Sequence, residues 1–502
     1  MGVDALAEYN GSLPTIEWEG LQQGYQIKEN INAKFLTNTN NNTIKLVRDK
    51  HYKIRAIISG LLINEQKELD KEKGIAGELV SPTDIVGTNN LGLEKYELSQ
   101  SYLGDVNYRW VPNALGAYDK KYEAILNTFH VRRFYDYNSS VVWLTEWFLN
   151  GPRGPFWYLR STERKFSETF ERNRSVYKNK ENKFSGELFE GFNDDYLFVK
   201  LSKYSFIIHK VPKHFGPSWS ENIGIEYRKE FGIIPDANER EAISEIVGFI
   251  FGKQLKNIGY TTFNEFGMPI EEVALNPWGN DVESICNSYE LSPIFKGEYK
   301  EMGKVEAILE QIIPKYLALR NEFNLDEALW RYWLANNMPV GTNLPMLMNG
   351  IEIISKAWFA SKKSKTNGVY LQKKEFDILL KNELNLIEMK VKGLEYGDRI
   401  INRMKGNFQM GANERMEIFF KEIGLEVGEV EKNAIKSRNV MIHSSYGSSP
   451  EEIRKIIKLT DAYKSFFNRV FLKLLGYEET YIDYYTLGHP HRLIDEVVGG
   501  KE

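Results

Sequence analysis

The stretch SPEEIRKIIKLTDAYKSFFNRVFLKLLG, residues 449–476, carries the clearest boundary signals in the chain. Ser449 suits the N-cap of a helix, Pro450 suits its first position, and Glu452 completes a capping box. Gly476 stands just past the last apolar residue, where helices commonly end. We therefore predict one long helix that begins at Pro450 and ends just before Gly476.

Further helical patterns precede this helix from about residue 303 onward. Their apolar residues recur three and four positions apart, which is the spacing of one helix face. Proline and glycine are expected only at the breaks between these runs. The runs are KVEAILEQIIPKYLALRNEF, LDEALWRYWLANN, NLPMLMNGIEIISKAWFAS and KKEFDILLKNELNLIEMK. Residues 303–502 are therefore predicted to form an all-α helical bundle with a short C-terminal tail.

Residues 1–300 have a different pattern of residue types. Short runs rich in aromatic and β-branched residues alternate with turn residues, as expected for strands. The clearest runs cover residues 43–63, 141–149 and 194–211. One segment, NEREAISEIVGFIFGKQL at 238–255, has helical spacing and is expected to be a helical insertion. We therefore predict an α+β protein whose N-terminal β-rich region has room for two subdomains.

Composition and charge narrow the classes of function. The chain has 502 residues and a net charge of -4 at pH 7. This charge excludes a protein that coats nucleic acid nonspecifically, because such a protein needs a positive overall field. A nuclease that uses a local basic patch remains possible. Cys286 is the only cysteine, which excludes a disulfide framework and a cysteine-rich metal site. Without a signal-peptide pattern or a run of about 18 apolar residues, we expect a cytoplasmic protein that uses no membrane. The sequence also lacks a phosphate-loop motif, and we expect no metal or cofactor.

A second short stretch, KSRNVMIHSS at residues 436–445, is a candidate active site. On a helix of about 100° per residue, Arg438 lies in the middle of an apolar stripe. A guanidinium there is costly to bury unless it is paired. Asn439 and His443 are four residues apart and share the flank beside this stripe. This pattern indicates a site made by an arginine, an asparagine and a histidine.

A structural interpretation of the same residues stays open. Arg438 would then belong to a buried ion pair, and His443 would be a helix-end residue favoured by the helix dipole. Glu352, in the apolar run MLMNGIEIISKAWF, is the best candidate for a supporting role in the site, because its carboxylate is expected to be buried and to need a cation, which Arg438 could supply. Lys356, one helical turn later, could pair with Glu352 instead. In the catalytic interpretation, Glu352 and Lys356 would support the site.

The motif and its place in the chain resemble those of a known family. Arg438, the polar Asn439 and His443, near the end of the penultimate major helix, resemble the R-x4-6-H motif of HEPN ribonucleases. The resemblance covers roughly residues 305–476, although Ser444 stands where many of these motifs have glycine. A β-rich region before such a bundle also loosely resembles the ApeA-like anti-phage defence proteins.

The resemblance implies a metal-independent endoribonuclease that acts as a homodimer, with two motif helices meeting at a shared cleft. It implies RNA as the substrate, with tRNA among the candidates, and a phage-derived trigger that acts on the N-terminal region in abortive infection. The residue types suit this chemistry. Arg438 could clamp a phosphate, His443 could move protons, and Asn439 could orient either group.

Two other functions stay open from the sequence. The helical bundle could serve only for dimerisation while the β-rich region binds a partner, without catalysis. Alternatively, paired carboxylates in the aromatic β-rich region could hydrolyse glycosidic bonds. Glu146 and Asp195 are candidates for such a pair, but no spacing selects them.

Overall fold

The computed structural model describes residues 18–32, 42–62, 83–89, 91–112, 118–135, 139–154, 156–172, 182–213, 215–277, 282–298, 301, 303–406, 410–443 and 449–500. Within these ranges the side chains of some residues, including 162–172, 182–193 and 438–443, lie outside the description. The chain divides into two compact units that interleave along the sequence. Unit 1 comprises Met1–Asp236, Leu255–Tyr289 and Gly297–Ala307, and unit 2 comprises Ala237–Gln254, Glu290–Lys296 and Ile308–Glu502.

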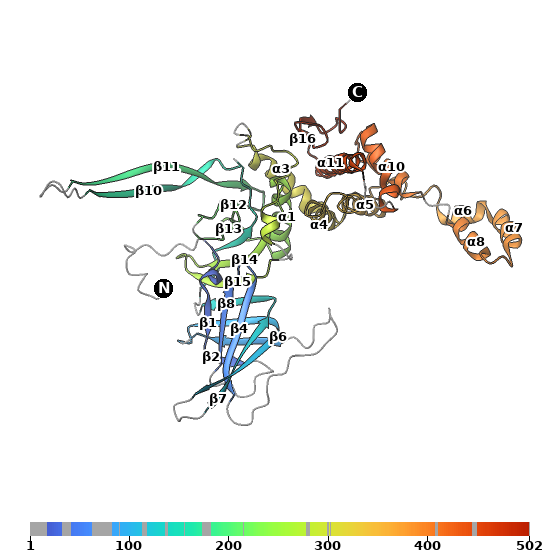
Figure 1. Ribbon diagram of the computed structural model, residues 1–502. Coiled ribbons are helices and arrows are strands. Elements are labelled where there is room, and N and C mark those ends of the chain that lie inside the picture. Colours follow the sequence, from blue (N-terminus) through green and yellow to red (C-terminus); the bar gives the residue numbers. More distant parts are fainter. Residues whose placement is uncertain are drawn as a thin grey trace. The chain divides into compact units, whose positions relative to one another are not determined.

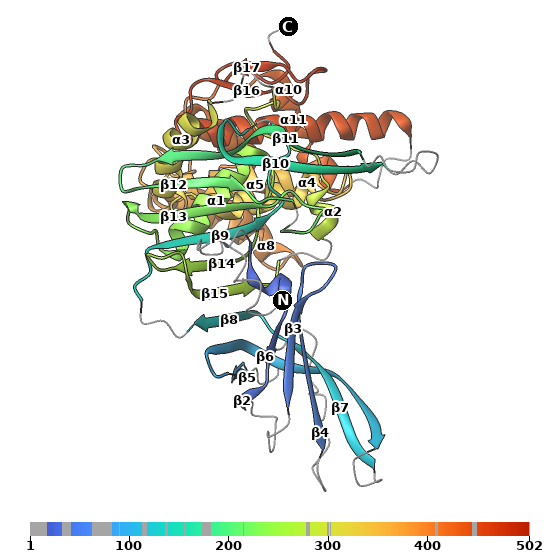
Figure 2. The same cartoon turned by 90° about the vertical axis from the view of Figure 1, so that its left-hand side faces the viewer.

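Unit 1 is built on a large antiparallel sheet, which has fifteen strands among the described residues (Figures 1 and 2). They are β1 (Tyr25–Ile27), β2 (Glu29–Asn32), β3 (Thr43–Arg48), β4 (Ile54–Leu62), β5 (Thr83–Thr88), β6 (Glu94–Pro112), β7 (Tyr118–Asn127), β8 (His130–Tyr135), β9 (Trp143–Leu149), β10 (Leu159–Arg172), β11 (Asn182–Lys200), β12 (Tyr204–Lys210), β13 (Ile223–Gly232), β14 (Lys256–Phe263) and β15 (Pro269–Leu275). The short segments η2 (Gly20–Gln23) and α2 (Val282–Cys286) accompany them.

The strand order departs from the chain order. It runs β1-β3-β4-β7-β6-β8-β15-β14-β9-β13-β12-β11-β10, while β5 pairs with β6 and carries β2. Figure 2 shows the strands from β11 to β8 following one another in this order. Alternate side chains of β3 and β4 enter one core, as the pleat requires, with Ile44, Leu46, Ala56 and Ile58 buried. The strands predicted from residues 43–63, 141–149 and 194–211 are confirmed.

Unit 2 is mainly helical (Figure 1). Its helices are α1 (Ala237–Phe251), α3 (Val305–Leu319, of which the residues from Ile308 belong to this unit), α4 (Leu325–Asn336), α5 (Leu344–Ala360), α6 (Lys373–Leu379), α7 (Lys381–Val391), α8 (Gly397–Lys405), α9 (Ala412–Glu422), α10 (Glu429–His443) and α11 (Pro450–Leu474). A two-stranded sheet of β16 (Thr480–Ile482) and β17 (His491–Leu493) follows. The α+β class is thereby confirmed, with a large antiparallel sheet before the C-terminal helices.

The predicted helical insertion at 238–255 is confirmed as α1, and it packs within unit 2. The Phe249 ring lies 4.7 Å from the Phe471 ring of α11. Glu245 accepts hydrogen bonds from the Tyr316 hydroxyl at 2.7 Å and from Arg320 Nε at 2.7 Å. The sequence predicted a single domain boundary near residue 300. The structure has two units that interleave along the chain, because α1 packs in the same core as the later helices.

The long helix α11 confirms its predicted boundaries. The Ser449 hydroxyl accepts a hydrogen bond from the Glu452 amide at 3.2 Å, and the Ser449 amide donates to the Glu452 carboxylate at 3.3 Å. Gly476 follows the helix with φ of +70°, a left-handed conformation that favours glycine. The start and end of this helix are therefore encoded by local contacts.

Three expectations for the helical region are wrong. The region 303–502 is not all-α, because its C-terminal part forms the small sheet of β16 and β17. The run at 373–390 is two helices, α6 and α7, separated at Leu380. Glycine and proline also occur inside helices, since Pro314 lies in α3 and Gly350 in α5. A Cβ atom at Gly350 would come within 3.0 Å of the Phe467 ring of α11. The glycine is there because α5 and α11 approach each other closely. Among the described helices, none has the length and apolar character needed to span a bilayer.

Candidate functional site

The motif residues Arg438, Asn439 and His443 fall on the last turns of α10. Earlier on this helix Ala434 and Ile435 are buried, as the predicted apolar stripe requires. Helix α10 packs against α5 and α11. The side chains of 438–443 and the following residues 444–448 lie outside the described residues, and so the predicted roles of the three motif residues stay predictions.

A buried ion pair fixes the first turn of α10. Glu431 of α10 pairs with Arg469 of α11, and both side chains are completely buried. Arg469 also donates to the carbonyl oxygens of Ile494 and Glu426, each at 3.1 Å, while Glu431 accepts from the Gly428 amide at 2.6 Å. Burial raises the pKa of the Glu431 carboxyl, although the Arg469 charge opposes this shift. The guanidinium and the carboxylate are thus both satisfied by the protein.

A second contact holds the middle of α10. The buried Tyr463 hydroxyl of α11 donates to the carbonyl oxygen of Ala434 at 3.0 Å. The Ser437 hydroxyl donates to the same oxygen at 2.8 Å. The helix that carries the motif is therefore attached to α11 along the turns just before Arg438. Such attachment limits the positions that side chains on the next turns can reach.

The predicted supporting residues lie on α5, which contacts α10. Glu352 is half-buried and Lys356 is exposed. The helix that carries Glu352 therefore lies next to the helix that carries Arg438. The predicted ion pair between Glu352 and Arg438 requires this arrangement. The proposed contact itself falls outside the described residues, because the Arg438 side chain is not among them.

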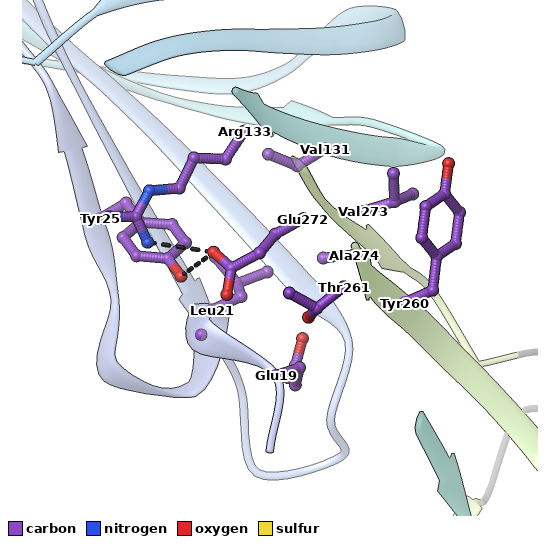
Figure 3. A pocket seen from close by; sticks show the side chains of 11 residues that line it. Glu19, Leu21, Tyr25, Val131, Arg133, Tyr260, Thr261, Glu272, Val273 and Ala274 are labelled. Carbon is purple, nitrogen blue, oxygen red and sulfur yellow. Dashed lines mark hydrogen bonds and ion pairs between the residues drawn. The ribbon is translucent and has the colours of Figure 1, made fainter. Parts of the chain in front are cut away.

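A separate polar cluster lines a small cavity in unit 1 (Figure 3). Glu272 of β15 lies directly opposite Arg133 of β8 in the sheet register. Its carboxylate accepts hydrogen bonds from the hydroxyls of Tyr25 and Tyr135, each at 2.9 Å, and from Arg133 at 3.0 Å. The cavity holds about 10 Å³, which is room for about one water molecule.

The Arg133 guanidinium is enclosed on several sides. It lies 4.2 Å from the centre of the Tyr25 ring and 4.4 Å from that of Tyr135. It also donates to Glu94 at 2.6 and 3.1 Å. Burial raises the pKa of both tyrosines, and so their hydroxyls stay protonated donors. Burial acts to raise the pKa of Glu94 as well, but the hydrogen bonds from Arg133 and Tyr96 lower it overall.

Glu19, which also lines this cavity, belongs to a second ion pair. Arg48 of β3 binds both carboxylate oxygens of Glu19, each at 2.9 Å. Arg48 also donates to the carbonyl oxygens of Leu275 at 2.6 Å and Ile258 at 2.8 Å. The charged groups around the cavity are therefore bound to one another. These bonds stabilise the sheet.

The sequence did not indicate either network of unit 1. Glu272 and Arg133 are 139 positions apart, and Glu19 and Arg48 are 29 apart. The one available signal was the placement of charged residues at inward positions of apolar strands, such as Glu272 within PIEEVAL of β15. That signal shows that a partner is needed but does not identify it.

The two candidates for glycoside hydrolysis, Glu146 and Asp195, are both buried. Asp195 is buried and accepts hydrogen bonds from the Ser161 amide at 2.8 Å and from its hydroxyl at 3.0 Å. Glu146 is buried in β9. Neither residue lines the cavity of unit 1. Within the described part of the chain, no three His, Cys, Asp or Glu side chains gather as a possible metal site.

The fold and the sequence were compared with known proteins. No protein-family model, no curated protein and no solved structure matches this chain. The assignment of a function therefore depends on the residues of α10 and on the way in which the fold holds that helix.

Proposed function

We propose that this protein is a metal-independent endoribonuclease with a HEPN-like helical domain. The observation that carries the proposal is the attachment of α10 to α11. A completely buried ion pair, Glu431 with Arg469, and the buried hydrogen bond from Tyr463 hold the helix immediately before the motif. Catalytic groups need such support, because small errors in their position cost large factors in rate.

The proposed reaction needs few protein groups. The 2'-hydroxyl of RNA is a nucleophile already tethered beside its phosphate, so a site has only to align it, move protons and stabilise charge. Arg438 would bind the phosphate oxygens with two parallel hydrogen bonds. His443 would act as general base or acid near neutral pH, and Asn439 would orient the histidine or the phosphate.

The two-copy arrangement is what the resemblance to HEPN ribonucleases implies. Ala434 and Ile435 are buried within one chain, where α10 packs against α5 and α11, and so a two-fold mate would meet α10 outside this buried stripe. We further propose that unit 1 senses a phage-derived trigger and restrains the nuclease, in keeping with abortive infection in the cytoplasm. A trigger shifts such an equilibrium only if it binds the active form more tightly.

The experiment that tests the function is an RNA cleavage assay on the full chain. Wild-type protein, His443→Ala and Lys436→Ala are each incubated with total RNA in EDTA, together with an infected-cell extract that supplies the trigger expected to release the restraint. Lys436 is exposed on the same helix, so its variant controls for charge and helix content. We expect cleavage by wild type and Lys436→Ala, and none by His443→Ala. Loss of wild-type cleavage in EDTA, or cleavage by His443→Ala, contradicts the proposal.

A second candidate is a non-catalytic protein that dimerises and binds a partner. The exposed apolar side chains between residues 370 and 400 favour it, because patches of this kind mark protein contacts. The same assay separates the two functions. A full chain that dimerises and stays inert toward RNA, with and without an infected-cell extract, supports the second candidate.

A further inference from the structure

Strands β6 and β7 of unit 1 continue together as a ribbon beyond some of their neighbours. The last residue of β6 that pairs with β8 is Ser99, and the last that pairs with β5 is Ser101. From Val106 to Pro112, β6 pairs with β7 in regular antiparallel register. Figure 2 shows β4 and β7 extending well past β8. Among the described residues, the outer edge of β6 is therefore open along this stretch.

The pleat of this ribbon gathers aromatic side chains on one face. Trp110 of β6 lies directly opposite Lys120 of β7. Tyr108 and Tyr118 are each two positions away along the same strands. Residues directly opposite each other share a face of the sheet, and so do residues two apart along one strand. We call Tyr108, Trp110, Tyr118 and Lys120 the aromatic face.

Two rings of the aromatic face are exposed. Trp110 and Tyr118 are 65% and 67% exposed, while Tyr108 is half-buried and packs against the core of the sheet. The Lys120 Nζ atom lies 4.6 Å from the centre of the Tyr108 ring and 5.8 Å from that of Trp110. Both distances lie within the range of cation–π attraction. The aromatic face therefore presents flat rings and a positive charge side by side.

The pleat also separates the charges of the ribbon. Asp119, Lys121 and Glu123 alternate with the residues of the aromatic face along β7, and so they lie on the opposite face. The described residues from 106 to 112 and from 118 to 122 place no acidic residue on the aromatic face. We therefore expect a partner that is flat and negatively charged.

We propose that the aromatic face binds single-stranded RNA, with bases stacked on Trp110 and Tyr118 and a phosphate beside Lys120. Every unpaired base has a flat π-face and carries an anionic phosphate, so a single strand matches rings and a cation together. A duplex stacks its bases on one another and offers their faces less readily. A protein matches this face less well, because lysine is depleted at the centre of protein interfaces, whereas Lys120 lies among the rings.

This inference deepens the proposed function and rests on it in naming RNA, since stacking on aromatic rings does not distinguish the sugars. It adds that unit 1 holds a single-stranded part of the substrate. The tests use RNA with 2'-O-methyl riboses, which lacks the nucleophile of the proposed cleavage. A chain that binds this RNA through Trp110 but cleaves no ordinary RNA contradicts the nuclease alone. A chain that cleaves RNA but does not need Trp110 for binding contradicts the aromatic face alone.

The first experiment measures the binding of a labelled single strand of about 12 nucleotides to the full chain by fluorescence anisotropy. Trp110→Ala is compared with wild type, Trp110→Phe and Trp330→Ala. Trp330 of α4 is the matched control, because it is 51% exposed and the Arg331 guanidinium lies 4.8 Å from its ring. We expect Trp110→Ala to raise the Kd about tenfold, and the other two variants to change it by less than about threefold.

Three results of this experiment would overturn the proposal. The first is that wild type does not bind the RNA, and the second is that it binds a duplex of the same sequence as tightly as the single strand. The third is a Kd for RNA that is unchanged in Trp110→Ala, including the case in which this variant loses binding to anionic vesicles or to a protein.

The second experiment compares two neighbouring lysines that are both half-buried. Lys120→Gln removes the charge of the aromatic face, whereas Lys121→Gln removes a charge of the opposite face. A cation that contacts one phosphate releases bound counterions, and so Lys120→Gln should reduce the slope of log Kd against log salt by about 0.7. Lys121→Gln should leave the slope unchanged. Equal slopes for the two variants overturn the placement of a phosphate beside Lys120.

Discussion

Arg469 of unit 2 and Arg133 of unit 1 both form ion pairs, but their surroundings differ. Arg469 of unit 2 is completely buried and faces one carboxylate, Glu431, with backbone carbonyl oxygens completing its hydrogen bonds. Arg133 of unit 1 retains 15% side-chain exposure and faces two carboxylates, Glu94 and Glu272, beneath two tyrosine rings. The first arginine attaches one helix to another. The second is the centre of a closed network within a sheet.

The difference supports α10, and not the cavity of unit 1, as the place of the proposed site. In unit 1 the charged groups around the cavity bind one another, and they are therefore committed to stability. In unit 2 the buried pair lies at the first turn of α10, and the polar motif residues follow two to three turns later. A helix fixed at one end and polar at the other is suited to present a site. Substitutions at the two arginines should therefore have unequal effects.

The largest expected effect is that of Arg469→Met. The substitution leaves Glu431 buried without its cation, and breaking a buried pair in this way costs about 3–5 kcal/mol. Thermal unfolding monitored by calorimetry measures the loss. The double variant Glu431→Leu/Arg469→Met should recover part of it, since no charge is then left unpaired. Equal destabilisation by the single and double variants would show that the ion pair is not what holds α10.

A smaller loss is expected for Arg133→Met. Glu94 keeps a hydrogen bond from Tyr96, and Glu272 keeps those from Tyr25 and Tyr135. The remaining carboxylates are therefore partly satisfied, and we expect a loss of about 2–3 kcal/mol, measured by the same unfolding experiment. A loss as large as that of Arg469→Met would mean that the tyrosine hydroxyls do not compensate Glu94 and Glu272 for the missing guanidinium. The proposed difference between the two arginines would then be wrong.

The smallest expected change in stability, that of Lys256→Met, is a gain and not a loss. Lys256 is a buried cation of β14, and burial lowers its pKa from 10.5 to about 8. The unfolded chain binds more protons than the folded one between these values, so stability should rise with pH from about 8 to 10.5. Lys256→Met should remove this slope and stabilise the protein at pH 7 by about 1–2 kcal/mol.

The control for this prediction is Lys229→Met, on an exposed position of β13. Its effect should stay within about 0.5 kcal/mol at each pH, as expected for surface substitutions. Unfolding curves recorded at several pH values measure both variants. An unchanged slope in Lys256→Met would show that Lys256 reaches water and is charged at little cost.

Predictions from the sequence were correct where neighbouring residues decide the structure, and they failed where residues far apart in the chain decide it. The boundaries of α11 were predictable because Ser449, Glu452 and Gly476 act within one turn of the helix ends. The break between α6 and α7 was not, because both segments continue the same apolar spacing. The strands of residues 43–63 were predictable from their composition, but the strand order was not, since composition carries no information on which strands pair.

The candidate site could also be predicted from the sequence only in part. Its placement on a helix, with Ala434 and Ile435 buried beside it, could be predicted from periodicity. The anchor could not, because Glu431 and Arg469 are 38 positions apart and neither residue type names its partner. The interleaving of the units also escaped prediction, because α1 has the same helical signal wherever its core lies.

The central claim is that α10 presents a site for attack by an RNA 2'-hydroxyl. Its most direct test uses an RNA that the full chain cleaves at a known position, and the same RNA with a 2'-deoxy nucleotide there, both in EDTA. His443→Ala serves as a folded control that should lose less than about 1 kcal/mol of stability. We predict products ending in a 2',3'-cyclic phosphate from the first RNA, and no cleavage of the second. Cleavage of the 2'-deoxy RNA at that position, or by His443→Ala, would contradict the account.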